Sequence, residues 1–108
     1  MQNRTLSDVK RAIENEVGVM LYFWKEHCNV CYSLQPKLFK SFKENFPAIK
    51  PITINIATHT NIATHFGVFS IPIAIIFLDK KEFARVGRNV SILALVNQIQ
   101  RPYEMLTS

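Results

Sequence analysis

The stretch Trp24 to Cys31, with the sequence WKEHCNVC, holds both cysteines of the chain. Two residues separate the cysteines, and a continuous apolar run from Val19 to Trp24 comes directly before them. A Cys-x-x-Cys pair is found both in metal sites and in redox-active sites. A structural disulfide explains the pair less well, because closing a loop of about four residues constrains the unfolded chain little.

The segments on either side of the pair indicate how it is held. The run 19–24 is apolar and of strand length, as expected for a strand buried on both faces of a sheet. From Cys28 to about Asn45 apolar residues recur at helical spacing, and Pro36 inside this segment predicts a kink. The cysteines are therefore expected between the end of a buried strand and the first turn of a helix.

The rest of the chain alternates helical and strand patterns. Helices are expected over 7–17 with Ser7 as N-cap, over 61–66 closed by Gly67, and from Ser91 to about Tyr103. Strands are expected over 49–56, which alternates from Ile52 onward and has Pro51 near its start, and over 72–78 and 82–86, which are joined by a turn at 79–81. This order predicts a single α/β domain over residues 1–108, with a central mixed sheet flanked by helices.

Composition and charge narrow the class of protein. The 108 residues are 48% hydrophobic, which is enough for one core. The net charge of +5 comes from scattered basic residues without a nucleic-acid motif, so no nucleic-acid partner is expected. No apolar run approaches the ~20 residues of a membrane span, and the N-terminus has no apolar signal core, so we expect a cytoplasmic protein that does not bind membranes. We also expect it to be a monomer.

The expected position of the cysteines suggests their chemistry. At the first turn of a helix, free N–H groups and the helix dipole favour a thiolate at Cys28. Cys31 lies one turn further, on the same side, close enough for a disulfide but more buried. Cys28 would attack a substrate disulfide, a mixed disulfide would form, and Cys31 would displace the reduced product.

Three motifs together resemble the thioredoxin family. They are Trp24-x-x-His27-Cys28-x-x-Cys31-x-x-x-x-Pro36, Phe66-Gly67-Val68-x-x-Ile71-Pro72 and Arg85-Val86-Gly87. The match extends from the first helix to about Arg101. The resemblance implies the thioredoxin fold and a thiol-disulfide oxidoreductase that reduces protein disulfides through Cys28 and Cys31. It also implies no cofactor beyond that pair, and an NADPH-dependent flavoprotein reductase as electron donor.

The resemblance also implies a substrate-binding surface around the pair. Trp24 looks like the aromatic residue that shields the site, and Gly87 like the small residue beside it. Pro72 resembles the family's cis-proline, and the backbone of Ile71 before it would pair with an extended substrate segment. His27 resembles the histidine of disulfide isomerases; as a cation it would stabilise the Cys28 thiolate, and the alternative is an exposed loop histidine.

Two positions depart from the family pattern. Tyr22 stands where thioredoxins have a buried acid, and Thr53 where they have its lysine partner, so both halves of an ion pair are absent together. A phenol ionises only near pH ~10, so we assign no proton transfer to Tyr22 and leave water or Glu26 for that step. Asn29-Val30 stands in place of the family's Gly-Pro and is expected to change the reduction potential of the Cys28–Cys31 pair.

A metal site is one alternative reading of the pair. Cys28, Cys31 and His27 offer three donors, whereas structural zinc usually takes four protein ligands. His59 and His65 lie in the middle of the chain with no second Cys-x-x-Cys to join them. We therefore expect no metal.

A non-catalytic docking module is the other alternative. Phe66, Phe69 and Ile71 beside Trp24 would then form an exposed patch that binds a partner. An adaptor has no need of two closely spaced thiols, so the intact pair favours a redox enzyme.

Overall fold

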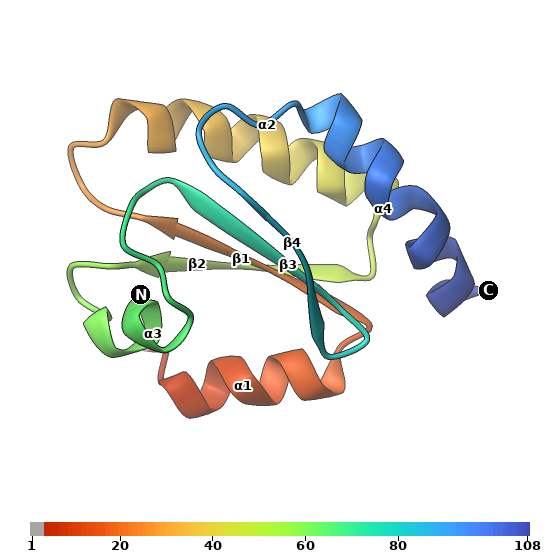
Figure 1. Cartoon of the computed structure of the whole chain (residues 1–108), viewed down its shortest axis with the longest axis horizontal. Helices are drawn as coiled ribbons and strands as arrows, with labels where there is room; N and C mark the ends of the chain where they lie inside the picture. Colours follow the sequence, from red (N-terminus) through yellow and green to blue (C-terminus); the bar gives the residue numbers. More distant parts are fainter. Residues whose placement is uncertain (1–3) are drawn as a thin grey trace.

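The computed structural model describes residues 4–108. The single domain was predicted over residues 1–108, and its first three residues lie outside the described residues. The elements in chain order are α1 (Leu6–Asn15), β1 (Gly18–Trp24), α2 (Asn29–Asn45), β2 (Ile49–Asn55), α3 (Thr60–His65), β3 (Ile73–Leu78), β4 (Lys81–Val86) and α4 (Ile92–Thr107). Helices α2 and α4 cover one face of the sheet, and α1 and α3 cover the other (Figure 1). The predicted order of elements and the predicted central mixed sheet flanked by helices are confirmed.

The four strands form one mixed sheet in the order β2-β1-β3-β4. Strand β1 is parallel to β2, to which α2 connects it, and antiparallel to β3, while β3 and β4 form an antiparallel hairpin. Because Phe23 pairs with Ile73, the end of β1 and the start of β3 lie at the same edge of the sheet (Figure 1). The loops that follow β1 and precede β3 therefore meet there.

Strand β1 contributes to two hydrophobic cores, which explains its unbroken apolar sequence. Met20 and Tyr22 pack into the core under α2 and α4. Val19, Leu21 and Phe23 pack into the core against α1 and α3. Alternate side chains of a strand point to opposite faces, so both faces of β1 are buried, as predicted. The same alternation places Tyr22 on the face that α2 covers.

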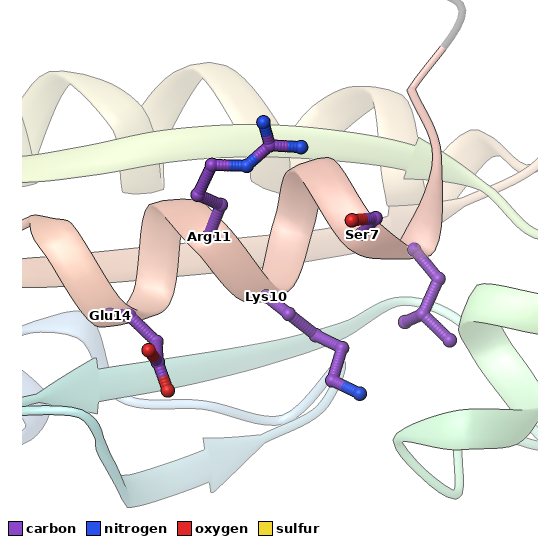
Figure 2. A pocket seen from close by; sticks show the side chains of 5 residues that line it. Ser7, Lys10, Arg11 and Glu14 are labelled. Carbon is purple, nitrogen blue, oxygen red and sulfur yellow. The ribbon is translucent and has the colours of Figure 1, made fainter.

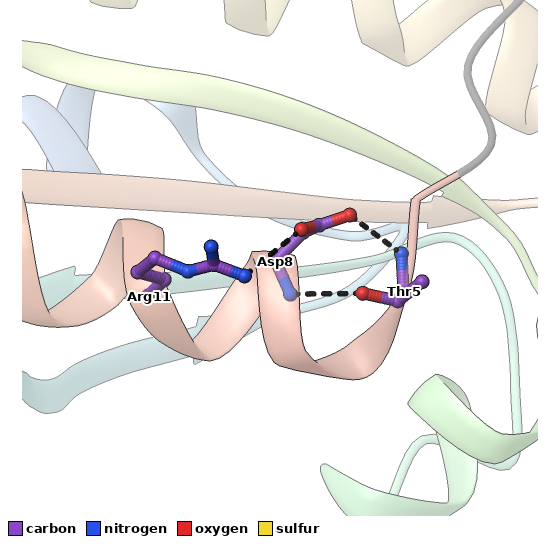
Figure 3. Close-up of polar contacts among 3 residues, drawn as sticks. All are labelled: Thr5, Asp8 and Arg11. Carbon is purple, nitrogen blue, oxygen red and sulfur yellow. Dashed lines mark hydrogen bonds and ion pairs between the residues drawn. The ribbon is translucent and has the colours of Figure 1, made fainter.

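Helix α1 begins earlier in the sequence than expected. Thr5, not Ser7, is the N-cap, so that prediction was wrong. The Asp8 N–H donates to the Thr5 hydroxyl at 3.1 Å, and the Asp8 carboxylate accepts the Thr5 N–H at 3.1 Å, while Arg11 pairs with Asp8 at 3.2 Å (Figure 3). These hydrogen bonds from Thr5 hold the pKa of Asp8 below its usual value. The reciprocal pair satisfies two free N–H groups of the first turn, which Ser7 cannot do.

Several other boundaries shift by a few residues. Strand β2 starts at Ile49 as predicted, with Pro51 near its start as an edge strand tolerates, but it ends at Asn55 and not at Ile56. Pro72 lies just before β3 rather than inside it. Helix α1 ends at Asn15 instead of reaching Val17, and α4 continues beyond Tyr103 to Thr107. The buried Tyr103 hydroxyl accepts the Ala48 N–H at 2.9 Å, which fixes this end of α4 against the chain before β2.

Two turns follow their sequence signals. Gly67 has a φ of 67° at the end of α3, and the Val68 N–H donates to the Ala63 carbonyl at 2.8 Å, so glycine closes this helix as predicted. Asp79 and Lys80, with φ of 51° and 71°, form the two-residue turn of the β3–β4 hairpin. Positive φ at both positions is typical of a type I′ turn.

Candidate redox site

Cys28 and Cys31 form a disulfide at the start of α2, with their Cα atoms 5.3 Å apart. Cys28 is the N-cap of the helix, and its Sγ accepts the N–H of Cys31 at 3.2 Å. An N-cap position normally presents an oxygen to these free N–H groups, and here a sulfur takes that place. The N-terminal turn of α2 is therefore arranged to favour negative charge on Cys28 when the disulfide opens.

The two sulfur-bearing residues differ in accessibility. Cys31 is 1% exposed and belongs to the buried residues of the domain, whereas Cys28 is only half-buried. An external disulfide can therefore approach Cys28 but not Cys31. This is the asymmetry that the sequence predicted.

The segment that leads into Cys28 is held by a contact that the sequence analysis missed. His27 is exposed and has a left-handed backbone, with a φ of 65°. Its N–H donates to the Tyr32 hydroxyl at 3.1 Å, and the Tyr32 ring lies 6.3 Å from that of Trp24. Tyr32 thus fixes the turn before the pair from the first turn of the helix that follows it. An aromatic residue directly following the second cysteine was the only available signal.

Tyr22 has a structural role that the sequence did not assign to it. Its hydroxyl donates to the Cys31 carbonyl at 2.8 Å from a side chain that is 1% exposed. Burial raises the pKa of Tyr22 to about 12, so the phenol is a neutral hydrogen-bond donor at pH 7 and not a proton carrier. A hollow of about 150 Å³ lies behind the pair and is lined by Tyr22, Trp24, Cys31, Tyr32, Gln35 and Thr53. Tyr22 and Thr53, where the family has the acid and its lysine partner, thus both line this hollow, and none of its lining side chains is charged.

The Ile71–Pro72 peptide bond is cis, as expected. It directly precedes β3, and the pairing of Phe23 with Ile73 sets it beside the end of β1. A Cβ added to Gly87 would lie 3.7 Å from the Pro72 carbonyl oxygen, so the chain after β4 reaches the same place. The structure thus brings together the segments that carry Trp24, Pro72 and Gly87.

The exposed patch that the docking-module alternative would need beside Trp24 is only partly present. Phe69 is 84% exposed, and Ile71 is half-buried. Phe66 is half-buried and turned inward, with its ring 5.8 Å from that of Phe77 and 6.5 Å from that of Phe23. Phe66 is therefore not available for such a patch, because its ring completes the core under α3.

Other features of the described residues lie apart from the pair. A hollow of about 490 Å³ runs along the outer face of α1 beside Ser7, Lys10, Arg11 and Glu14 (Figure 2), on the opposite side of the sheet from α2. Within residues 4–108, no three His, Cys, Asp or Glu side chains gather closely enough to hold a metal ion. In the same range, every helix is too short or too polar to span a bilayer.

Comparisons with known proteins agree with this geometry. The family model described as thioredoxin matches residues 2–101. The thioredoxin-like protein YdfQ of Bacillus subtilis is 29% identical over 101 residues, covering 94% of this chain and 89% of that protein. Thioredoxin of Rickettsia felis is 32% identical over 73 residues, covering 68% and 70% of the two chains. The structure of a mutant thioredoxin from Halobacterium salinarum, 18% identical, superposes with a TM-score of 0.76 over 95% of this chain and 87% of its own.

A mixed sheet that carries a Cys-x-x-Cys disulfide at the start of a helix defines a protein-disulfide oxidoreductase with the thioredoxin fold. The family match extends over nearly the whole chain. This chain belongs to the thioredoxin family, and it acts on disulfides of protein substrates.

Proposed function

We propose that this protein works as a reductase of protein disulfides, with Cys28 as the attacking thiol and Cys31 as the resolving thiol. The observation that carries the proposal is the difference in burial, since Cys28 is half-buried and Cys31 is 1% exposed. The attacking sulfur must reach a disulfide in another protein, while the resolving sulfur needs to reach only Cys28.

The reaction consists of two exchanges. The Cys28 thiolate attacks one sulfur of the substrate disulfide, forming a mixed disulfide and releasing the other substrate sulfur as a thiolate, which takes up a proton. Cys31 then loses its proton and attacks the Cys28 sulfur, which breaks the mixed disulfide and releases the second substrate thiol. Two electrons pass to the substrate, and the Cys28–Cys31 disulfide is the oxidised product.

The proton of Cys31 leaves through water in this scheme. The neutral Tyr22 hydroxyl donates to the Cys31 carbonyl, and its raised pKa disfavours the anionic form that a base would need. The hollow behind the pair has room for water, because one molecule occupies about 30 Å³ of liquid and the hollow measures about 150 Å³. Glu26, which is exposed, is the alternative acceptor.

Substrate binding involves the residues around the pair. Trp24 and His27 precede Cys28 in the chain, and the Ile71–Pro72 segment offers backbone groups to an extended substrate strand. Gly87 leaves this surface open, since no side chain projects there. Backbone pairing of this kind gives affinity without demanding one substrate sequence.

Further parts of the proposal concern the setting in which the protein works. A single domain spanning residues 1–108 acts as a monomer in the cytoplasm. It uses no cofactor besides its own disulfide and binds neither membranes nor nucleic acid. A flavoprotein reductase that uses NADPH returns two electrons to the Cys28–Cys31 disulfide after each cycle.

Trapping of the mixed disulfide tests the roles of the two thiols. With Cys31→Ser, Cys28 can attack but no second thiol displaces the substrate from the mixed disulfide. Mixed disulfides with substrate proteins should therefore accumulate, and dithiothreitol should reduce them. Cys28→Ser is the matched control and should trap none. Equal trapping by both variants, or noncovalent capture of the same partners by both, would contradict the assignment and favour a docking module.

The reduction potential of the pair tests the direction of the reaction. Equilibration of the protein in dithiothreitol and glutathione buffers, followed by thiol labelling, measures it. A potential near about −270 mV supports a reductase, because such a pair donates electrons in a reducing compartment. A value near about −180 mV or higher would instead indicate an isomerase or an oxidase.

A further inference from the structure

Arg88 lies in the loop that follows β4, and this loop reaches the cis peptide that precedes β3. Val86 pairs with Ala74 of β3, so the chain after Val86 runs past the segment that precedes β3. There, Nη2 of Arg88 donates to the carbonyl of Ile71 at 3.4 Å. This long hydrogen bond positions the guanidinium next to the cis peptide and leaves most of its N–H donors free.

The charge of Arg88 is free for a partner, unlike that of its neighbour Arg85. Arg85 binds the Glu82 carboxylate through two nitrogens, at 2.9 and 3.0 Å, and also donates to the Gly67 carbonyl at 3.3 Å. In the chain from residue 4 onward, no carboxylate lies within 4.0 Å of a nitrogen of Arg88. Arg88 is exposed, so a carboxylate from another molecule can approach it.

An exposed aromatic ring stands in the same region. Phe69 is 84% exposed and lies two residues before Ile71, whose carbonyl receives the Arg88 hydrogen bond. An isolated exposed apolar side chain needs no explanation by itself. Here, however, the ring belongs to the same short segment as the Ile71 carbonyl that holds the unpaired guanidinium of Arg88.

We propose that Arg88 and Phe69 select protein disulfides whose flanking segment carries an acidic residue next to an apolar one. The inference rests on the proposed reductase function and narrows its substrates. A substrate strand lying along Ile71 would place its carboxylate on the free guanidinium and its apolar side chain on Phe69. The net charge of +5 acts in the same direction, since it accelerates the approach of acidic partners.

The test compares two peptide disulfides in single-turnover reduction by the protein reduced beforehand with dithiothreitol. The peptides are identical, with leucine near the cysteine, except that one has glutamate and the other lysine at the flanking positions. The readout is the ratio of the two rate constants, measured by rapid alkylation and mass spectrometry. The parent protein should prefer the glutamate peptide about two- to five-fold at low salt, as expected for an exposed ion pair, and less at high salt.

Charge reversal at Arg88 should remove or invert this preference. Arg88→Glu is compared with Arg101→Glu, an exposed position on α4 that changes the net charge by the same amount. A neutral variant, Arg88→Gln, should give a ratio between those of the parent and Arg88→Glu. Phe69→Ser should slow the reduction of both leucine peptides without changing their ratio.

The outcomes separate this inference from the function on which it rests. If the parent reduces the neutral 2-hydroxyethyl disulfide but treats both peptides alike, the selection by Arg88 is refuted and the reductase function stands. Equal loss of preference in Arg88→Glu and Arg101→Glu would also refute it, because overall charge would then be the cause. If the parent reduces none of the three disulfides, the proposed function fails and the inference fails with it.

Discussion

Replacement of Tyr22 by phenylalanine tests whether the buried hydroxyl stabilises the turn that carries Cys31. The hydroxyl donates to the Cys31 carbonyl at 2.8 Å, and the side chain is 1% exposed. Phenylalanine keeps the ring and its packing and removes only the donor. Because one buried hydrogen bond contributes about 1 kcal/mol net, the free energy of unfolding at pH 7 should fall by about that amount.

The pH dependence of the same variant provides a sharper test. Burial raises the pKa of Tyr22 from its ordinary value near 10 to about 12, so the folded state favours the neutral phenol. As pH rises above 10, the tyrosine of the unfolded chain ionises first, and the parent protein loses stability until pH passes the folded value. The loss is about 1.4 kcal/mol at pH 11, and the Tyr22→Phe variant does not have it. The two stability curves should therefore cross between about pH 10.5 and 11.

Urea unfolding of both oxidised proteins from pH 7 to 11, followed by circular dichroism, measures these curves. Every other titrating group is common to the two proteins, so the difference between their free energies isolates Tyr22. Absorbance at 295 nm during alkaline titration gives an independent record of its ionisation. A free-energy difference that stays constant between pH 7 and 11 would refute the argument from burial, and no difference at pH 7 would refute the argument from the hydrogen bond.

Two further substitutions test local geometry. Thr5→Ala should lower the free energy of unfolding by about 1 kcal/mol, because Thr5 caps α1, while Ser7→Ala should have little effect; thermal unfolding of the two variants decides which residue is the cap. Gly18→Ala should cost about 1–3 kcal/mol, because the added Cβ would lie 2.9 Å from Cγ1 of Ile49. Gly87→Ala, with its nearest atoms at 3.7 Å, is the matched control, and equal melting temperatures for the two alanine variants would contradict the crowding at Gly18.

The sequence predicted those features that depend on neighbouring residues. The apolar run of β1, the spacing of Cys28 and Cys31 and the glycine at position 67 each specify a local structure, and all three are found as expected. The cis bond before Pro72 was also expected, since only proline makes such a bond common.

The contacts that the sequence did not predict join distant parts of the chain. The hydrogen bond from Tyr22 to the Cys31 carbonyl spans nine residues, and that from Arg88 to the Ile71 carbonyl spans 17. Both depend on which face of the sheet a side chain takes and on which strand ends lie together. The wrong N-cap had a different cause, because Ser7 and Thr5 are both good capping residues, and the partner acid at position 8 decides between them.

Three loops form the surface around the disulfide. One follows β1, one precedes β3 and one follows β4. The outermost positions of these loops, 25–27, 69–70 and 88–89, are all exposed. None of them belongs to either hydrophobic core. Substitutions in one loop can therefore be combined with substitutions in another at little cost to the cores, so a library that varies positions 25, 69–70 and 89 would change what the protein recognises while the two cores and the Cys28–Cys31 pair beneath are kept.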